Sequence, residues 1–225
     1  MIQRLARLLN RRPRPLSSEL AYQKWAAAYP PHAHNALMRA EEAAVLQVLP
    51  PLTGKVVLDL ACGTGRYALL CDQRGAQQVI GLDSSIDMLV RSPAPRRAAA
   101  SMDHVPLAAE SIDVIVCGLA IGHLRTIQNA FSEMARVLKI GGTAVISDVH
   151  PLLFQSGAQR TFEVNGVVFA VEHTVHAIST VIDTAAAVGL TLDAFAEPPL
   201  LPADQPVSTL SSPVAVIYRF TKQTN

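Results

Sequence analysis

The chain has 225 residues, of which 50% are hydrophobic and 16% are charged, and its formal net charge is +1. This composition supplies enough apolar surface for a packed core, so wholesale disorder is excluded, and the length suits a single domain. The near-zero net charge creates no field that attracts nucleic acid, and it favours a small, neutral or apolar partner.

The cysteine pattern argues against a disulfide framework or a zinc cluster. The three cysteines, Cys62, Cys71 and Cys117, are odd in number and form no Cys-x-x-Cys pair. A reducing cytoplasm is the expected compartment. We expect no membrane span, because no apolar run is long enough, and no signal peptide, because no apolar region follows the basic start.

The first 17 residues are predicted to form a basic, flexible arm. Five arginines fall within residues 1–15, with no acidic residue among them. One interpretation is weak contact with a membrane surface or an anionic partner. The other is a solvated terminus, which is the interpretation we favour.

Two helices are expected in residues 18–50, ahead of the main fold. Ser18 is a candidate N-cap for a helix that reaches Ala28 and is stopped by Pro30. Asn35 is a candidate N-cap for a second helix that continues to Val48. We expect these two helices to act as a cap on a single domain that spans residues 18–225.

Strands and helices then alternate up to residue 150. Strands are expected at residues 56–60, 78–82, 98–101, 112–117 and 143–148, and helices at residues 66–74, 86–91 and 127–138. The glycines Gly141 and Gly142 are expected to stop the last of these helices. This βαβα rhythm predicts an α/β fold with a parallel, doubly wound sheet.

The rhythm changes after Pro151. Asn165-Gly166 separates two apolar runs, and this dipeptide is a strong signal for a hairpin because both turn positions need a positive φ. We predict a β-hairpin from residues 161–164 and 167–171. A helix at 179–188 and two final strands at 191–196 and 214–221 complete the pattern.

A glycine-rich turn follows the first strand of this alternation. Gly63 and Gly65 allow the backbone to approach a ligand closely, and a helix begins directly after them. Asp83 ends the next strand, where an acid can accept both hydroxyls of an adenosine ribose. Asp83 has a second interpretation as a helix cap, because Ser84 and Ser85 follow it.

Residues 55–150 carry four motifs, in order, that resemble the core of class I S-adenosylmethionine-dependent methyltransferases. The resemblance is strongest to the branch that includes the ubiquinone and menaquinone biosynthesis enzymes. The motifs are Leu58-Asp59-Leu60-Ala61-Cys62-Gly63-Thr64-Gly65, Gly81-Leu82-Asp83-Ser84-Ser85, Asp103-His104-Val105-Pro106-Leu107 and the run from Glu133 to Gly142. Two positions depart from the family pattern: His104 replaces a smaller residue, and Ile140 replaces a proline.

The resemblance implies a Rossmann-like, seven-stranded sheet with an antiparallel last strand, and S-adenosylmethionine as cofactor. It implies ribose binding by Asp83, contact with the adenine amino group by Asp103, and an aromatic residue such as Tyr22 over the cofactor. The expected cofactor contacts are Asp59, Ala61, Cys62, Gly63, Gly65, Asp83, Ser84, Met88, Asp103, His104 and Tyr22.

Two other functions stay open. The run Gly63-x-Gly65-x-x-Ala68 also fits nicotinamide-dependent oxidoreductases, although an acid as close as Asp59 would repel a pyrophosphate. A protein that binds S-adenosylmethionine without catalysis, as a partner of another protein, is the second alternative.

The histidines are the candidates for handling the methyl acceptor, which we expect to be a small molecule. His150 and His123 follow strands at the edge where ligands bind, so either is a candidate general base. Four others are expected near the acceptor: His32, His34, His173 and His176. A metal bound by His173 and His176 is disfavoured, because no third ligand accompanies them.

We expect residues 151–176 and the N-terminal helices to form a lid, with His150 at the pocket floor. The atom methylated and the oligomeric state are left undetermined.

Overall fold

The computed structural model describes residues 13–155, 157–201 and 212–224. Its helices are α2 (Ser18–Trp25), η1 (Ala26–Ala28), α3 (Ala36–Val48), α4 (Arg66–Gln73), α5 (Ile86–Leu89), η2 (Ile121–His123), α6 (Gln128–Val137), α7 (Leu152–Gln155) and α8 (Ile178–Ala187). Its strands are β1 (Pro15–Leu16), β2 (Val56–Leu60), β3 (Gln78–Asp83), β4 (Arg96–Ala99), β5 (Ile112–Gly118), β6 (Leu138–Val149), β7 (Arg160–Val164), β8 (Val167–Val171), β9 (Leu190–Ala196) and β10 (Ala215–Lys222).

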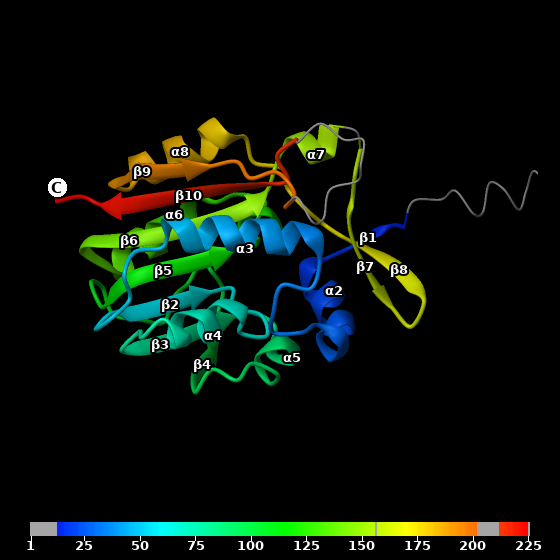
Figure 1. Cartoon of the computed structure of the whole chain (residues 1–225), viewed down its shortest axis with the longest axis horizontal. Helices are drawn as coiled ribbons and strands as arrows, with labels where there is room; N and C mark the ends of the chain where they lie inside the picture. Colours follow the sequence, from blue (N-terminus) through cyan, green and yellow to red (C-terminus); the bar gives the residue numbers. More distant parts are fainter. Residues whose placement is uncertain (1–12, 156, 202–211, 225) are drawn as a thin grey trace, which may run out of the picture.

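The main sheet has seven strands in the order β4-β3-β2-β5-β6-β10-β9. The strands from β4 to β6 pair in parallel, whereas β10 is antiparallel to both of its neighbours, β6 and β9 (Figure 1). The strand order reverses direction between β2 and β5, which places a ligand crevice beyond their carboxyl ends. The predicted doubly wound α/β fold with an antiparallel last strand is therefore confirmed.

Helices cover both faces of this sheet. Phe131 and Met134 of α6 and Val181 of α8 pack with sheet residues in one buried cluster. Val45 of α3 and Tyr67 of α4 belong to a second buried cluster on the opposite face. Because both faces are closed by apolar packing, a ligand has access to the sheet at the strand ends.

The end of α6 differs from the prediction. The helix stops at Val137, and β6 begins at once with Leu138, so Gly141 and Gly142 lie inside a strand. Gly141 has a φ of +75°, and the pairing of β6 with β5 shifts register at this point. The expectation that these glycines stop the helix was wrong, because they form an irregularity within the β5–β6 ladder instead.

The predicted hairpin is confirmed as β7 and β8. Asn165 and Gly166 have φ angles of +51° and +76°, as a two-residue turn of this kind requires. The hairpin forms a separate three-stranded sheet, because β1 pairs in parallel with β8. Pro15 and Leu16, which the sequence placed in the N-terminal arm, therefore form a strand, while residues 1–12 of that arm lie outside the described residues.

The hairpin and α2 lie together beyond the carboxyl ends of β2, β5 and β6 (Figure 1). Ala21 of α2 is buried against Phe162 and Val171 of the hairpin, and Trp25 stacks on Phe162 with ring centroids 4.7 Å apart. The helix is capped by Ser17, one residue earlier than predicted, through the backbone N–H of Leu20. These elements are placed where they can cover a ligand.

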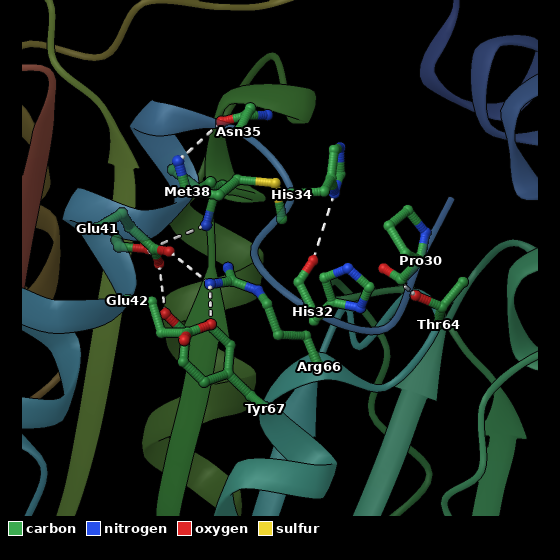
Figure 2. Close-up of polar contacts among 12 residues, drawn as sticks. Pro30, His32, His34, Asn35, Met38, Glu41, Glu42, Thr64, Arg66 and Tyr67 are labelled. Atoms are coloured by element: carbon green, nitrogen blue, oxygen red, sulfur yellow. Dashed lines mark hydrogen bonds and ion pairs between the residues drawn. The ribbon is translucent and has the colours of Figure 1, made fainter. Parts of the chain in front are cut away.

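A buried carboxylate fastens α3 to the main fold. Glu41 has no exposed surface, and it accepts hydrogen bonds from the hydroxyls of Tyr67 in α4, at 2.6 Å, and Ser147 in β6. The Arg66 guanidinium lies 2.9 Å from Glu41 and 3.1 Å from Glu42 (Figure 2). Charge-assisted hydrogen bonds of this kind fix the geometry of both partners. The network thus ties the cap helix to the helix that starts after the glycine-rich turn.

We predict that Glu41→Gln destabilises the fold much more than Glu42→Gln does. Glu41 is a buried partner of Arg66, so removing its charge leaves the guanidinium less compensated and should cost about 2–4 kcal/mol. The Glu42 side chain is 23% exposed, so its loss should cost less than about 1 kcal/mol. Urea unfolding of both variants measures the difference, and equal losses would contradict the proposed anchoring by Glu41.

Candidate functional site

The turn between β2 and α4 is tightly folded. Ala61, Gly63 and Gly65 all have positive φ angles, of 59°, 55° and 88°. A Cβ atom on Gly65 would lie 2.4 Å from the Ser92 hydroxyl oxygen, so this position requires glycine for space as well as for conformation. We call residues 61–65 the glycine loop.

Asp59 supports the start of α4 from the end of β2. The helix has Gly65 as its N-cap, which carries no side chain to accept a hydrogen bond. The Asp59 carboxylate accepts instead from the backbone N–H of Ala68, at 2.7 Å. Burial raises the pKa of Asp59 to about 7. The acid thus replaces a missing cap and is held in a poorly solvated position.

Asp83 fastens the glycine loop from the neighbouring strand. One carboxylate oxygen accepts from the backbone N–H of Gly63 at 2.7 Å, and the other accepts from Ser85 at 2.8 Å. Burial raises the pKa of Asp83 as well. Each oxygen keeps a second lone pair, so the carboxylate can still accept two hydroxyl groups of a ligand. Asp83 therefore orders the glycine loop and can still accept hydrogen bonds from a ligand.

A cavity lies between the glycine loop and α2, and we call it the loop cavity. It is lined by the glycine loop, Asp59 and Asp83, and is closed on the other side by Tyr22, His123 and Arg160. The predicted site residues that line it are Asp59, Ala61, Cys62, Gly63, Asp83, Ser84, Met88, Tyr22 and His123. Segments that are far apart in the sequence thus meet at one chamber.

The remaining predicted residues lie elsewhere. Asp103 and His104 are exposed, directly after Met102, which does line the loop cavity. His32 is exposed, and His34 packs edge-on against Trp25 and Tyr29. Gly65 forms the helix cap rather than part of the described lining.

The two C-terminal candidate histidines precede α8, so they do not share a helix face. His173 stacks on Phe154 with ring centroids 4.5 Å apart, and His176 contacts the carbonyl of Leu124 at 3.0 Å. Among the residues that the structure describes, no group of three His, Cys, Asp or Glu side chains could hold a metal ion.

His150 is buried but faces away from the loop cavity. Its Nε2 lies 2.8 Å from the Glu197 carboxylate, and its Nδ1 accepts from the backbone N–H of Leu152 at 3.2 Å. It is not among the described residues that line the loop cavity. Both ring nitrogens are therefore engaged in contacts that fasten the segment after β6.

A hydrogen-bonded chain joins Arg160, Tyr22 and His123. Arg160 donates to the Tyr22 hydroxyl oxygen at 3.0 Å, and the same hydroxyl is hydrogen-bonded to His123 Nε2, 2.9 Å away. Burial, followed by the Arg160 charge, holds the pKa of His123 well below its usual value. His123 is therefore neutral near pH 7.

Arg160 and Glu41 were missed by sequence reasoning. Glu41 had a detectable signal, since it falls on the apolar face of α3 with Met38, Ala44 and Val45, where an acid needs a buried partner. Arg160 had none, because the sequence of an inserted hairpin does not tell which face of its strands meets the main domain.

The sequence matches the family model of the methyltransferase domain over residues 58–146. This range contains the glycine loop and Asp83. It also contains most of β2, all of β3, β4 and β5, and most of β6. The matched range thus holds most of the described residues that line the loop cavity.

Two curated relatives are similar over about half of this chain. A demethylmenaquinone methyltransferase of Thermobifida fusca is 33% identical over 122 residues, which cover 50% of this chain and 51% of that protein. A malonyl-[acyl-carrier protein] O-methyltransferase of Methylovorus is 34% identical over 117 residues, which cover 46% of this chain and 40% of that protein. The chain thus spans about half the length of the curated relatives it matches.

The fold is also similar to solved structures. An S-adenosylmethionine-dependent methyltransferase from Mesorhizobium loti superposes with a TM-score of 0.69 at 22% identity, covering 81% of this chain and 97% of that one. The predicted resemblance is confirmed by these comparisons. Residues 58–146 match the methyltransferase domain, and the fold of the chain is that of solved S-adenosylmethionine-dependent methyltransferases.

Proposed function

We propose that this chain transfers a methyl group from S-adenosylmethionine to a small-molecule acceptor. The observation that carries the proposal is the position of Asp83, which faces the glycine loop within the methyltransferase domain. One relative described above is named for demethylmenaquinone, which supports a small organic acceptor, and the other for a malonyl group carried on acyl-carrier protein. The low net charge of the chain agrees with an acceptor other than nucleic acid.

The cofactor is proposed to lie along the floor of the loop cavity. Asp83 accepts the ribose hydroxyls with its second lone pairs, and Met88 and Met102 lie beside the nucleoside. Asp103 is proposed to reach the adenine amino group from its place next to Met102, with His104 beside it. Tyr22 covers the opposite side of the cofactor, toward the sulfonium.

The electrostatics beside the glycine loop favour a cationic ligand over an anionic one. Asp59 and Asp83 are acids with pKa values raised by burial, so their charged forms lack solvent and gain from a nearby cation. S-adenosylmethionine carries a sulfonium and an ammonium, whereas a dinucleotide carries a pyrophosphate. This contrast argues against nicotinamide-dependent oxidation.

Methyl transfer needs position more than it needs acid–base chemistry. The acceptor attacks the methyl carbon in line with the carbon–sulfur bond, which breaks as the new bond forms, and S-adenosylhomocysteine leaves. A base is needed only if the acceptor must lose a proton. We propose His123 for that role, because its neutral ring lines the loop cavity, whereas His150 is not among the described residues that line it.

The segments around the cavity are proposed to act as a lid. Arg160 from the hairpin and Tyr22 from α2 both line the loop cavity, so residues 151–176 and the cap helices enclose the reaction.

No helix within the described ranges is long and apolar enough to cross a membrane. We propose a cytoplasmic location on the basis of the cysteine pattern.

We predict that the protein binds S-adenosylhomocysteine and does not bind NAD. Asp83→Ala should weaken S-adenosylhomocysteine binding at least tenfold, because it removes charge-assisted hydrogen bonds that contribute about 1.5–3 kcal/mol each. Isothermal titration calorimetry measures both. Asp87→Ala, which removes an exposed acid four residues away, is the matched control and should leave affinity unchanged.

Binding of NAD without binding of S-adenosylhomocysteine would overturn the proposed function. An unchanged dissociation constant for S-adenosylhomocysteine in Asp83→Ala would mean that Asp83 orders the glycine loop but does not bind the ligand. Binding of the cofactor product without methyl transfer to any component of a cell extract, followed with a deuteromethyl-labelled cofactor, would favour a non-catalytic binding partner.

We predict that His123→Gln lowers kcat for a hydroxyl acceptor by about 10²–10⁴-fold while the S-adenosylhomocysteine affinity is retained. Glutamine still accepts a hydrogen bond from Tyr22 but is not a base. His150→Gln serves as the comparison and should affect stability more than kcat, because His150 contacts Glu197 rather than the cavity. A larger loss of kcat in His150→Gln than in His123→Gln would assign the base to His150.

A further inference from the structure

Arg160 occupies the point where the hairpin meets the main domain. It is the first residue of β7, and its side chain reaches back to the carbonyl of Leu119 at 2.8 Å and to the Tyr22 hydroxyl at 3.0 Å. These contacts use two of its five N–H donors. They orient the guanidinium without neutralising its charge.

Among the described residues, the charge of Arg160 lacks a paired acid. Within residues 13–155, 157–201 and 212–224, no ion pair joins Arg160 to a carboxylate. Asp148 acts on Arg160 electrostatically, but its carboxylate accepts from the backbone N–H of Val149, and burial raises its pKa to about 7. A poorly solvated cation of this kind is stabilised by an anion that also accepts its hydrogen bonds.

A second cavity adjoins Arg160, and we call it the cap cavity. Its volume is about 260 Å³, and it is lined mainly by aromatic and aliphatic side chains, among them Trp25, Tyr29, Met38 and Phe154. Arg160 is the one charged side chain among the described residues that line it. Arg160 also lines the loop cavity, so a group bound to its guanidinium would lie between the apolar chamber and the proposed cofactor site.

We propose that Arg160 binds a carboxylate of the methyl acceptor, whose apolar body occupies the cap cavity. The proposal rests on the proposed function and names the class of substrate. A cavity of about 150 Å³ already accommodates benzene, so the cap cavity has room for one aromatic ring or a short aliphatic chain.

A carboxylate suits this position better than a phosphate monoester does. The planar guanidinium pairs with a carboxylate through two parallel hydrogen bonds, and the two charges cancel. A phosphate monoester would bring close to two negative charges to one cation and leave an excess in a poorly solvated site. The net charge of the whole chain did not indicate a preference for an anionic acceptor, because a net charge does not reveal a single local cation.

Calorimetry on the complex with S-adenosylhomocysteine tests the proposal. The probes are benzoate and phenylacetate, each compared with its neutral amide, benzamide and phenylacetamide. The protein should bind each acid at least tenfold more tightly than its amide. Arg160→Gln should abolish the preference, since it removes the charge and keeps N–H donors, and Arg160→Lys should retain part of it. Thermal unfolding verifies that both variants are folded.

The outcomes separate this proposal from the proposed function. Equal binding of acids and amides by the unaltered protein, or a preference that survives in Arg160→Gln, would overturn the carboxylate site. A tenfold loss of S-adenosylhomocysteine affinity in Arg160→Gln would instead assign Arg160 to the carboxylate of the cofactor. Failure of the unaltered protein to bind S-adenosylhomocysteine at all would count against the proposed function, before any probe is added.

Discussion

Two carboxylates that accept backbone N–H groups hold the glycine loop, and the rest of the site depends on this constraint. Asp59 holds the first turn of α4, and Asp83 holds Gly63. Each hydrogen bond to a charged acceptor contributes about 1.5–3 kcal/mol, which offsets the strain of the positive φ angle at Ala61. Because α4 begins at this loop, the same contacts also set the position of Arg66, which is paired with Glu41 of the cap.

The acids that order the loop also bias what it can bind. Burial raises the pKa of Asp59 to about 7, so the folded state holds a proton there between about pH 4 and pH 7 that the unfolded state releases. This contribution to stability is complete at low pH and is lost as the pH rises through 7. A cation beside Asp59 would restore part of it. We therefore expect the folded protein to be more stable near neutral pH when an ammonium or a sulfonium is bound beside Asp59.

Sequence patterns predicted the elements with strong local signals. The apolar run of β2, the cap at Asn35 and the turn at Asn165-Gly166 depend on a few neighbouring residues, and all three are as expected. Gly141 and Gly142 were misassigned, since glycine after a helix and glycine in a strand irregularity look alike in sequence. Asp83 could be found because its place at the end of β3 is a property of the fold. Arg160 could not be found, because its partners lie on α2 and after β5, and the position of an inserted hairpin is a tertiary property.

The most direct measurement of the central claim is a crystal structure of the complex with S-adenosylhomocysteine. We expect the ribose hydroxyls to lie within hydrogen-bond distance of Asp83, about 2.5–3.0 Å, while the bonds from Gly63 and Ser85 to that carboxylate persist. The sulfur should lie toward His123 and Arg160. A nucleoside bound away from Asp83, or a glycine loop that rearranges and releases both carboxylates, would contradict this claim.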